Sequence, residues 1–216
     1  MKKIITITAT ALFFITAATA QKVNFGFNGG LTMSNYKVES DGTSYTSKSK
    51  AGFTVGFFTD IPINKRFSFQ PALQFTQKGG MDKESSDGQD YTLNLTMDYI
   101  EIPFNFLYKF NSSKTIFYIG GGPTLSYGVS GALKLSGGGE DGKADIKFGN
   151  NDDDDFKQVD RGANVLAGAQ FKSGVSIGLS YNMSFSNSVI DGDGDNSYHN
   201  RYFGMRIGYM LKGKKK

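Results

Sequence analysis

The chain has 216 residues, with 28 Gly, 19 Phe and 11 Tyr but no Cys and no Trp. This length suits one domain with a sizeable core or one barrel, the small and aromatic residues favour β-structure, and disulfide bonds are excluded. The formal net charge of +4 rests on lysines near the two ends. No basic stripe interleaved with aromatic residues is present, so nucleic acid is not an expected partner.

The start of the chain has the parts of a secretory signal peptide. Two lysines precede an apolar run over residues 4–14, and Ala18 and Ala20 form a small-residue cleavage signature. We therefore predict a cleaved signal peptide over residues 1–20 and one mature domain over residues 21–216. The apolar run is shorter than the roughly 20 residues of a spanning helix, and no later segment comes closer. A membrane-spanning form must then be a closed barrel, because only helices and closed barrels pair all their backbone groups in lipid.

Eight segments alternate between large apolar residues and small or polar ones, which is the pattern of β-strands with two different faces. In the second of them, for example, Phe53, Val55 and Phe57 alternate with glycine and threonine. The segments cover residues 23–33, 51–61, 67–76, 93–108, 117–129, 161–171, 175–185 and 202–211.

The fourth segment changes phase near its middle. Its large apolar residues are odd-numbered up to Tyr99 and even-numbered from Ile100 onward. A β-bulge within residues 98–100 would keep all of them on one face, because one extra residue in a strand shifts the alternation.

The connections between the segments alternate between short and long. The short ones are residues 62–66, 111–114 and 172–174, and the long ones are residues 35–50, 79–91, 131–160 and 187–200. Short turns on one side and long loops on the other are typical of outer-membrane barrels. The sequence therefore predicts an all-β fold, an eight-stranded antiparallel up-and-down transmembrane β-barrel, with both termini in the periplasm and the long loops outside the cell.

A soluble barrel with its apolar face inward, such as a lipocalin-type carrier, has the same alternation. Against it, the opposite face is rich in Gly, Ser, Thr and Asn, which suits the narrow interior of a small barrel. The aromatic residues are too many and too large for that interior, and the loop lengths alternate regularly. These features favour the membrane barrel.

Four stretches resemble the porin-family outer-membrane β-barrel domain, the group that includes PorT-like proteins. They are GFTVG at residues 52–56, FQPALQFTQKG at 69–79, YIEIP at 99–103 and GGGP at 120–123. The resemblance covers most of the mature chain and implies an outer-membrane location and a barrel, but it does not establish a pore. One departure is Ala72, where the family pattern has Glu after the proline, which implies fewer charges inside the barrel.

The inward parity carries four charged residues, Asp60, Glu101, Lys109 and Arg206, among Gln70, Gln74 and Gln170. Charges in a narrow lumen need partners, and the lumen of an eight-stranded barrel is normally filled by side chains. We therefore predict a structural network of charges that plugs the lumen, with Glu101 paired to Arg206.

Asp191, Asp193 and Asp195 stand at alternate positions of the last long loop, which is how a calcium loop begins. The sixth position is Asn196 and the twelfth is Tyr202, so the EF-hand pattern fails. Calcium stays a candidate there, although Asp, Gly and Asn are also ordinary turn residues. We expect no other cofactor.

The third long loop contains four consecutive acids, Asp152 to Asp155. It is interpreted as a solvated acidic loop, with divalent cations bridging it to lipopolysaccharide as the alternative. The single histidine, His199, lies near Ser197 and Asp195, but alternate residues of one strand stand side by side without the facing geometry of a triad. The sequence therefore does not predict an enzyme.

Three functions remain open at this point. The first is a non-enzymatic surface or structural protein that contacts outer-membrane lipid, lipopolysaccharide and unknown proteins through its long loops. The second is a narrow channel for small solutes. The third, which rests on the PorT-like resemblance, is a barrel component of a protein-secretion apparatus.

Overall fold

The computed structural model describes residues 23–86, 88–138, 141–190 and 196–211. The strands are β1 (Asn24–Ser40), β2 (Thr43–Thr46), β3 (Lys50–Pro62), β4 (Phe67–Ser86), β5 (Gln89–Asn111), β6 (Thr115–Gly137), β7 (Gly142–Ile146), β8 (Phe148–Gly149), β9 (Phe156–Lys157), β10 (Val159–Phe171), β11 (Val175–Ser184) and β12 (Ser197–Leu211). The predicted signal peptide lies outside the described residues.

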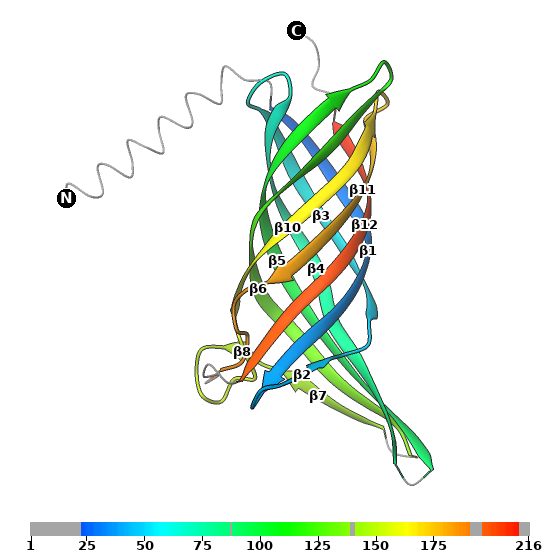
Figure 1. Ribbon diagram of the computed structural model, residues 1–216, viewed down its shortest axis with the longest axis vertical. Coiled ribbons are helices and arrows are strands. Elements are labelled where there is room, and N and C mark those ends of the chain that lie inside the picture. Colours follow the sequence, from blue (N-terminus) through cyan, green and yellow to red (C-terminus); the bar gives the residue numbers. More distant parts are fainter. Residues whose placement is uncertain (1–22, 87, 139–140, 191–195, 212–216) are drawn as a thin grey trace, which may run out of the picture.

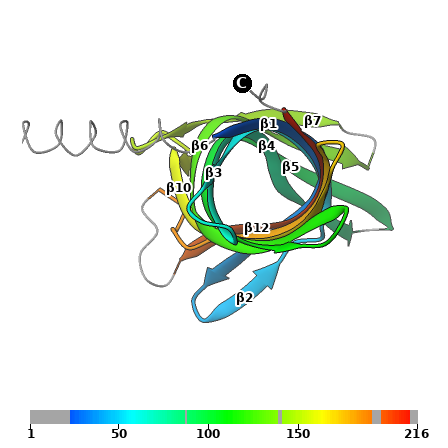
Figure 2. The same cartoon turned by 90° about the horizontal axis from the view of Figure 1, so that it is seen from above.

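Eight of these strands form a closed antiparallel ring in the order β1, β3, β4, β5, β6, β10, β11 and β12, because β12 pairs with β1 and β10 pairs with β6. Figure 1 shows the tilted strands from the side, and Figure 2 shows the ring along its axis. The fold is an eight-stranded up-and-down β-barrel. The eight predicted segments and their order are confirmed.

The two faces of the barrel differ as the alternation predicts. Large apolar side chains such as Phe57 and Ile207 point outward and are 71% and 66% exposed. The inward positions hold small or polar residues, among them Thr32, Thr54 and Thr76, which are buried. A soluble carrier would bury its apolar face, so the outward position of that face excludes the carrier interpretation. No helix in the described part of the chain is long and apolar enough to cross a membrane.

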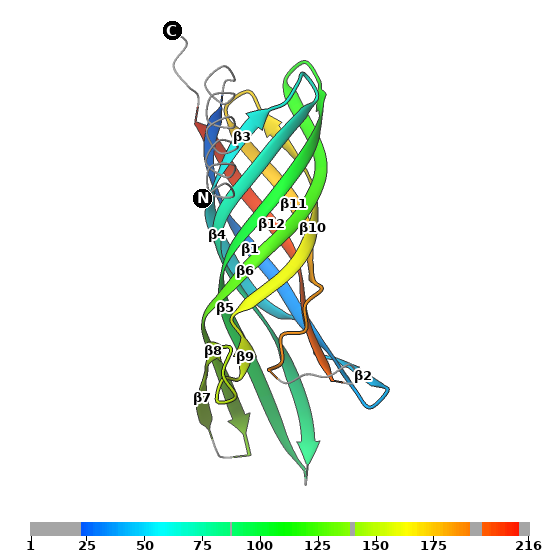
Figure 3. The same cartoon turned by 90° about the vertical axis from the view of Figure 1, so that its left-hand side faces the viewer.

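The two ends of the barrel are unlike each other. The three predicted short connections lie where β1 begins and β12 ends, and each is closed by a backbone hydrogen bond, for instance from Gly174 to Phe171. We call this the turn end. The opposite loop end carries β2 and the long extensions of β4, β5 and β6 (Figure 3).

Much of what the sequence indicates as loop at this end is strand. β4 and β5 stay paired up to Ser86 and Gln89, β6 continues to Gly137, and β7 pairs with residues 131–135 of β6. These strands form a protruding sheet in the order β4, β5, β6 and β7 (Figure 1). The expectation of a loop over residues 79–91 is therefore wrong, because antiparallel pairing continues to a tight turn at Gly88, whose φ is +76°.

The predicted bulge is present at the predicted level but in the neighbouring strand. Asp98 pairs with Ser130 and Tyr99 with Gly128, so the extra residue is Val129 of β6. β5 keeps its phase, and its odd-numbered residues remain inward throughout; Met97 and Tyr99 are completely buried. The phase change in the sequence thus marks where the apolar residues of β5 move from the lipid face to an internal cluster.

This internal cluster, which we call the aromatic cluster, lies beyond the ring's polar lumen at the loop end. It consists of Tyr36, Leu95, Met97, Tyr99 and Tyr198, with Phe148 and Phe156 packed against it. Ring centroids lie 4.9 Å apart for Tyr36 and Tyr198 and 5.4 Å apart for Tyr99 and Phe148. The short parallel pair β8–β9 brings Phe148 and Phe156 to it.

Candidate functional site in the barrel lumen

The lumen contains two groups of charged side chains at different heights. Near the turn end, Lys109 of β5 reaches across β4 to Asp60 of β3, and its Nζ lies 2.7 Å from both carboxylate oxygens. Phe58, two residues before Asp60, also points inward. A Cβ on Gly26 would stand only 2.3 Å from the Phe58 ring. Glycine at position 26 therefore makes room for an aromatic ring inside the barrel.

The second group, which we call the loop-end ion cluster, lies nearer the loop end and consists of Lys78 of β4, Glu101 of β5 and Asp160 of β10. Lys78 Nζ lies 2.6 Å from Glu101 Oε1 and 3.8 Å from Asp160 Oδ2. Its ammonium also lies 4.5 Å from the ring centroid of Tyr99, a distance at which a cation is attracted by the ring face. Three strands are thus tied together inside the ring.

Glu101 receives a complete set of donors. Besides Lys78, it accepts hydrogen bonds from Gln74 Nε2 at 2.9 Å, from Tyr202 Oη at 2.8 Å and from Ser126 Oγ at 3.0 Å. Its side chain has no solvent exposure. A buried carboxylate is tolerated when it is paired and its remaining lone pairs are satisfied, which is the arrangement found here.

The predicted pair between Glu101 and Arg206 is wrong. Arg206 of β12 donates from Nη2 to Tyr202 Oη at 3.2 Å, and Tyr202 in turn donates to Glu101. The two residues are therefore linked through a phenol, while Lys78 holds the carboxylate directly. Of the four predicted lumen residues, Asp60 and Lys109 meet each other, and Glu101 and Arg206 belong to one network.

Three members of this network were missed from the sequence for a common reason. All three stand at or just beyond the ends of the predicted segments: Lys78 follows the segment 67–76, Asp160 ends the predicted connection 131–160, and Tyr202 begins the last segment. The sequence did contain a signal for Lys78, because position 78 continues the series of inward positions 74 and 76 of β4. The strands extend farther than the alternation of large apolar residues, so counting those residues alone ends the strand too early.

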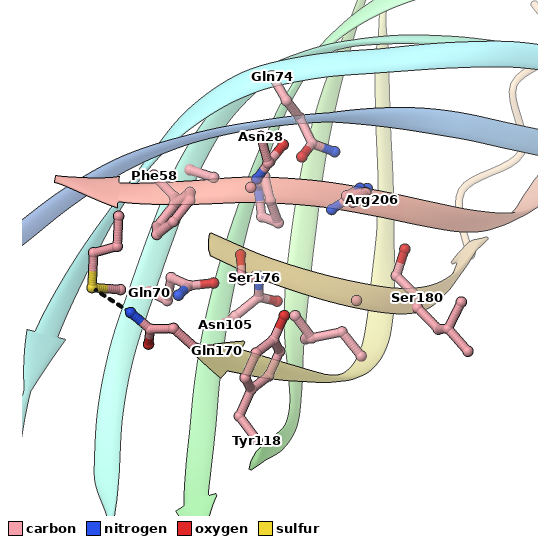
Figure 4. A pocket seen from close by; sticks show the side chains of 17 residues that line it. Asn28, Phe58, Gln70, Gln74, Asn105, Tyr118, Gln170, Ser176, Ser180 and Arg206 are labelled. Atoms are coloured by element: carbon pink, nitrogen blue, oxygen red, sulfur yellow. Dashed lines mark hydrogen bonds between the residues drawn. The ribbon is translucent and has the colours of Figure 1, made fainter. Parts of the chain in front are cut away.

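A cavity of about 50 Å³ lies in the lumen between the two charged groups, and Figure 4 shows the polar and apolar side chains that line it. Its wall includes Asn28, Gln70, Asn105, Ser176 and Arg206, which point toward one another from different strands of the ring in Figure 4. Cavities that bind drug-sized molecules are several times larger, typically about 300–1,000 Å³. The lumen is therefore filled by side chains apart from this small space.

At the loop end, a tyrosine pair binds one carboxylate outside the ring. Tyr45 donates to Asp82 Oδ1 at 2.5 Å, and Tyr36 donates to Asp82 Oδ2. The hydrogen bond to Asp82 raises the pKa of Tyr45 to about 12, and burial, followed by the same carboxylate, raises the pKa of Tyr36. Both phenols therefore stay protonated and hold β1, β2 and β4 together at neutral pH.

The acidic loop is partly ordered by its own backbone. Asp154 Oδ2 accepts from the amide of Asn151 at 2.9 Å, and Asp155 Oδ2 accepts from the amide of Lys147 at 2.8 Å. These two carboxylates act as turn caps. The described ranges contain no cluster of three or more metal-ligand side chains, and Asp191, Asp193 and Asp195 lie outside the described residues, so a calcium site there stays a prediction.

His199 lies in β12, opposite Lys37 of β1. Its Nδ1 has no hydrogen-bond partner within the described residues. Ser197 stands opposite Glu39 on the same pair of strands. The Glu39 carboxylate is hydrogen-bonded to the Ser197 side chain. Asp195 lies outside the described residues, so an arrangement of Asp195, Ser197 and His199 is not tested.

Comparison with known proteins gives one family. A family model described as the outer membrane protein beta-barrel domain matches residues 19–214. No curated protein matches the chain.

Among solved structures, the chain is similar to three kinds of outer-membrane protein. The attachment invasion locus protein Ail of Yersinia pestis, solved with the heparin analogue sucrose octasulfate, is 17% identical, with 88% of this chain and 99% of that chain covered and a TM-score of 0.42. Neisserial surface protein A is 15% identical, with coverages of 86% and 97% and a TM-score of 0.37. The outer membrane protease OmpT of Escherichia coli is 11% identical, with coverages of 87% and 97% and a TM-score of 0.33.

Proposed function

Because the chain belongs to the family of outer membrane protein beta-barrel domains, we propose that it is a non-enzymatic surface protein whose barrel anchors a protruding sheet for contacts with other molecules. The observation that carries this proposal is the contrast between the two parts of the molecule. The lumen contains two groups of paired charges and is filled by side chains apart from one small cavity, whereas β4, β5, β6 and β7 extend together beyond the ring.

The protruding sheet has features that support an interaction role. β7 is its edge strand, since it pairs with β6 and with no other strand of the described chain, and an unpaired edge offers backbone donors and acceptors to another molecule. On one face, Leu93 and Leu135 line a groove of about 330 Å³ together with Tyr45, Asp82, Glu84 and Tyr91. The sheet thus combines an open edge with an amphipathic face.

The unequal ends of the barrel support a proposed orientation in the membrane. Outer-membrane barrels have short periplasmic turns and longer extracellular extensions. With the turn end in the periplasm, both termini lie there and the protruding sheet stands outside the cell, in contact with lipopolysaccharide at its base and with protein partners farther out.

Single-cysteine labelling tests this orientation, because the chain has no native cysteine. Cysteine replaces Lys143 of β7 in one variant and Lys172 of a short turn in the other, and intact cells are treated with a membrane-impermeant maleimide. Labelling of the K143C variant alone, with K172C labelled only after permeabilisation, is the expected result. The reverse pattern would refute the proposed orientation.

Two further experiments test the function itself. Purified protein in planar lipid bilayers should give no steady current, and a reproducible open conductance would favour the narrow channel instead. A photocrosslinking residue at Leu135 should capture a macromolecule in intact cells, whereas the same residue at the lipid-facing Phe57 serves as the control. Equal yields at both positions would contradict an interaction role for the sheet.

The secretion-apparatus alternative rests on the PorT-like resemblance alone. It predicts stable co-purification with other membrane proteins through the barrel wall. A barrel that elutes alone in mild detergent would remove it.

A further inference from the structure

The cavity between the two charged groups has a wall of apolar side chains such as Phe58 and Leu166 and of polar side chains that are not fully matched by their neighbours. Arg206 is the only charged residue in that wall, and its Nε is buried without a hydrogen-bond partner among the described residues. On the same wall, Gln74 Oε1, Asn105 Oδ1 and Asn28 Oδ1 are also buried and unmatched. Gln74 and Asn105 are 2% and 3% exposed. We call this space the lumen chamber.

The buried atoms without a hydrogen-bond partner include one donor, Arg206 Nε, and several acceptors, which are amide oxygens. The orientation of Gln74 is fixed, because its Nε2 donates to Glu101 and its oxygen must therefore face the other way. Arg206 Nε can only donate. A single type of ion cannot satisfy both residues, since an anion accepts from Arg206 but repels the amide oxygens, and a cation does the opposite.

The charges of the surrounding network are already balanced. Lys78 and Arg206 carry two positive charges, and Glu101 and Asp160 carry two negative ones. Arg206 reaches this balance through Tyr202, which bridges it to Glu101. An additional ion in the lumen chamber would leave an unpaired charge in a low-dielectric space, which is costly.

We propose that the lumen chamber is a site for resident water molecules that connect Arg206 to the amide wall. Water donates and accepts at once, carries no charge, and in buried sites makes about three hydrogen bonds. A buried water needs roughly 10–15 Å³ of such space, so a chamber of about 50 Å³ holds about three or four of them. This site is distinct from the surface role proposed above and does not depend on it.

Ala72 of β4 creates the space for these waters. It lies on the chamber wall, opposite Phe58 of β3, and its side chain ends at Cβ. A larger side chain at this inward position would enter the chamber. The site therefore depends on a small residue at position 72 as much as on the polar groups around it.

Magnetic relaxation dispersion of water oxygen-17 tests the proposal, because it counts long-lived internal waters in the reconstituted protein. The wild-type barrel is compared with Ala72→Leu, which fills the chamber, and with Ala167→Leu, which makes the same change on the exposed outer face of β10. We expect the count to fall by about three in Ala72→Leu and to stay unchanged in Ala167→Leu. Thermal unfolding should show a lower Tm for Ala72→Leu, because the polar wall loses its partners.

Each other outcome overturns the proposal. An unchanged water count together with a higher Tm for Ala72→Leu would mean a dry cavity that gains from filling. If the protein broadens the chlorine-35 NMR line of chloride and Arg206→Gln abolishes this broadening, the chamber is an anion site. If Ala72→Leu fails to fold, Ala72→Val gives the same comparison with a smaller side chain, and an unchanged count there would again refute resident water.

Discussion

Lys78 and Glu101 form an ion pair in which neither side chain is more than 2% exposed, with Nζ 2.6 Å from Oε1. They stand on adjacent strands but not opposite each other, since Lys78 pairs with Met97 and Glu101 with Gln74 in the register of β4 and β5. The pair therefore crosses the strands diagonally inside the barrel. The contribution of this ion pair to the stability of the barrel can be measured.

Removing the ammonium should destabilise the barrel. In Lys78→Met, Glu101 and Asp160 lose their cation in a buried position, and breaking one partner of such a pair costs about 3–5 kcal/mol. Urea unfolding in lipid vesicles, followed by the heat-dependent shift of the folded band in gels, measures the loss. The double variant Lys78→Met with Glu101→Leu should recover part of it, and a single variant as stable as wild type would contradict the burial of this pair.

The contact between Gly26 and Phe58 should be sensitive to a single methyl group. A Cβ at position 26 would stand 2.3 Å from the Phe58 ring, so Gly26→Ala should cost about 1–3 kcal/mol by overpacking. Gly29→Ala on the same strand is the control, because a Cβ there meets nothing closer than 3.6 Å. Adding Phe58→Leu to Gly26→Ala should relieve the strain; equal stability of the two alanine variants would disprove the crowding.

Tyr36 and Tyr45, which donate to Asp82, should ionise at a higher pH than an ordinary tyrosine. The pKa of Tyr45 is raised to about 12 from 10.0, mainly by its hydrogen bond to Asp82, and that of Tyr36 is raised by burial and the same carboxylate. Because these pKa values are raised on folding, their stabilising effect is complete below pH 10 and is lost as the pH rises through the folded-state values. Absorbance at alkaline pH should show two phenols ionising earlier in Asp82→Asn.

Asp98→Asn provides the matched control for that titration. Asp98 accepts hydrogen bonds from Gln77 and Ser130 and from no tyrosine. Its replacement should leave the alkaline absorbance curve unchanged. A shift of equal size in both variants would mean that the loss of one negative charge, and not the loss of the hydrogen bonds to Asp82, changes the tyrosine pKa values.

The aromatic cluster should hold the third loop in place. Phe148 packs 5.4 Å from Tyr99 and 6.3 Å from Phe156, measured between ring centroids. Phe148→Ala should weaken this packing by about 1–3 kcal/mol and make residues 147–158 sensitive to protease in folded protein. Asp145→Ala, which removes the exposed pair with Lys143, should have little effect, and equal cleavage in the two variants would rule out a holding role for Phe148.

The barrel could be predicted from the sequence because its two faces demand different residues at every second position. Lipid on one side requires residues such as Phe57 and Ile207, and a narrow lumen on the other requires residues such as Thr54 and Gly208. The number and order of the strands follow from this constraint, and the alternation of short and long connections separately indicates which end of the barrel is which. The constraint weakens beyond the membrane, which is why the extensions of β4, β5 and β6 were predicted as loop.

The pairing inside the lumen was harder to predict. Parity places Glu101 and Arg206 on the same face, but it does not give the height of one strand against its neighbours or the reach of a lysine. Lys78 pairs with Glu101 because its partner in the register, Met97, is two same-face positions from Glu101, a distance that a lysine side chain can span, whereas Tyr202 stands between Glu101 and Arg206. The bulge was placed at the right level and in the wrong strand, because one sequence cannot show which of two paired strands holds the extra residue.

Val129 divides β6 into a part with small polar residues on its inward face and a part with apolar residues there. Before it, Thr124 and Ser126 face the lumen, and after it Leu133 and Leu135 take the corresponding side. A change of length beyond this residue by an even number of positions in paired strands would keep every side chain on its face without altering the barrel below. The protruding sheet is thus a part that mutation can lengthen, shorten or exchange while the membrane anchor stays the same.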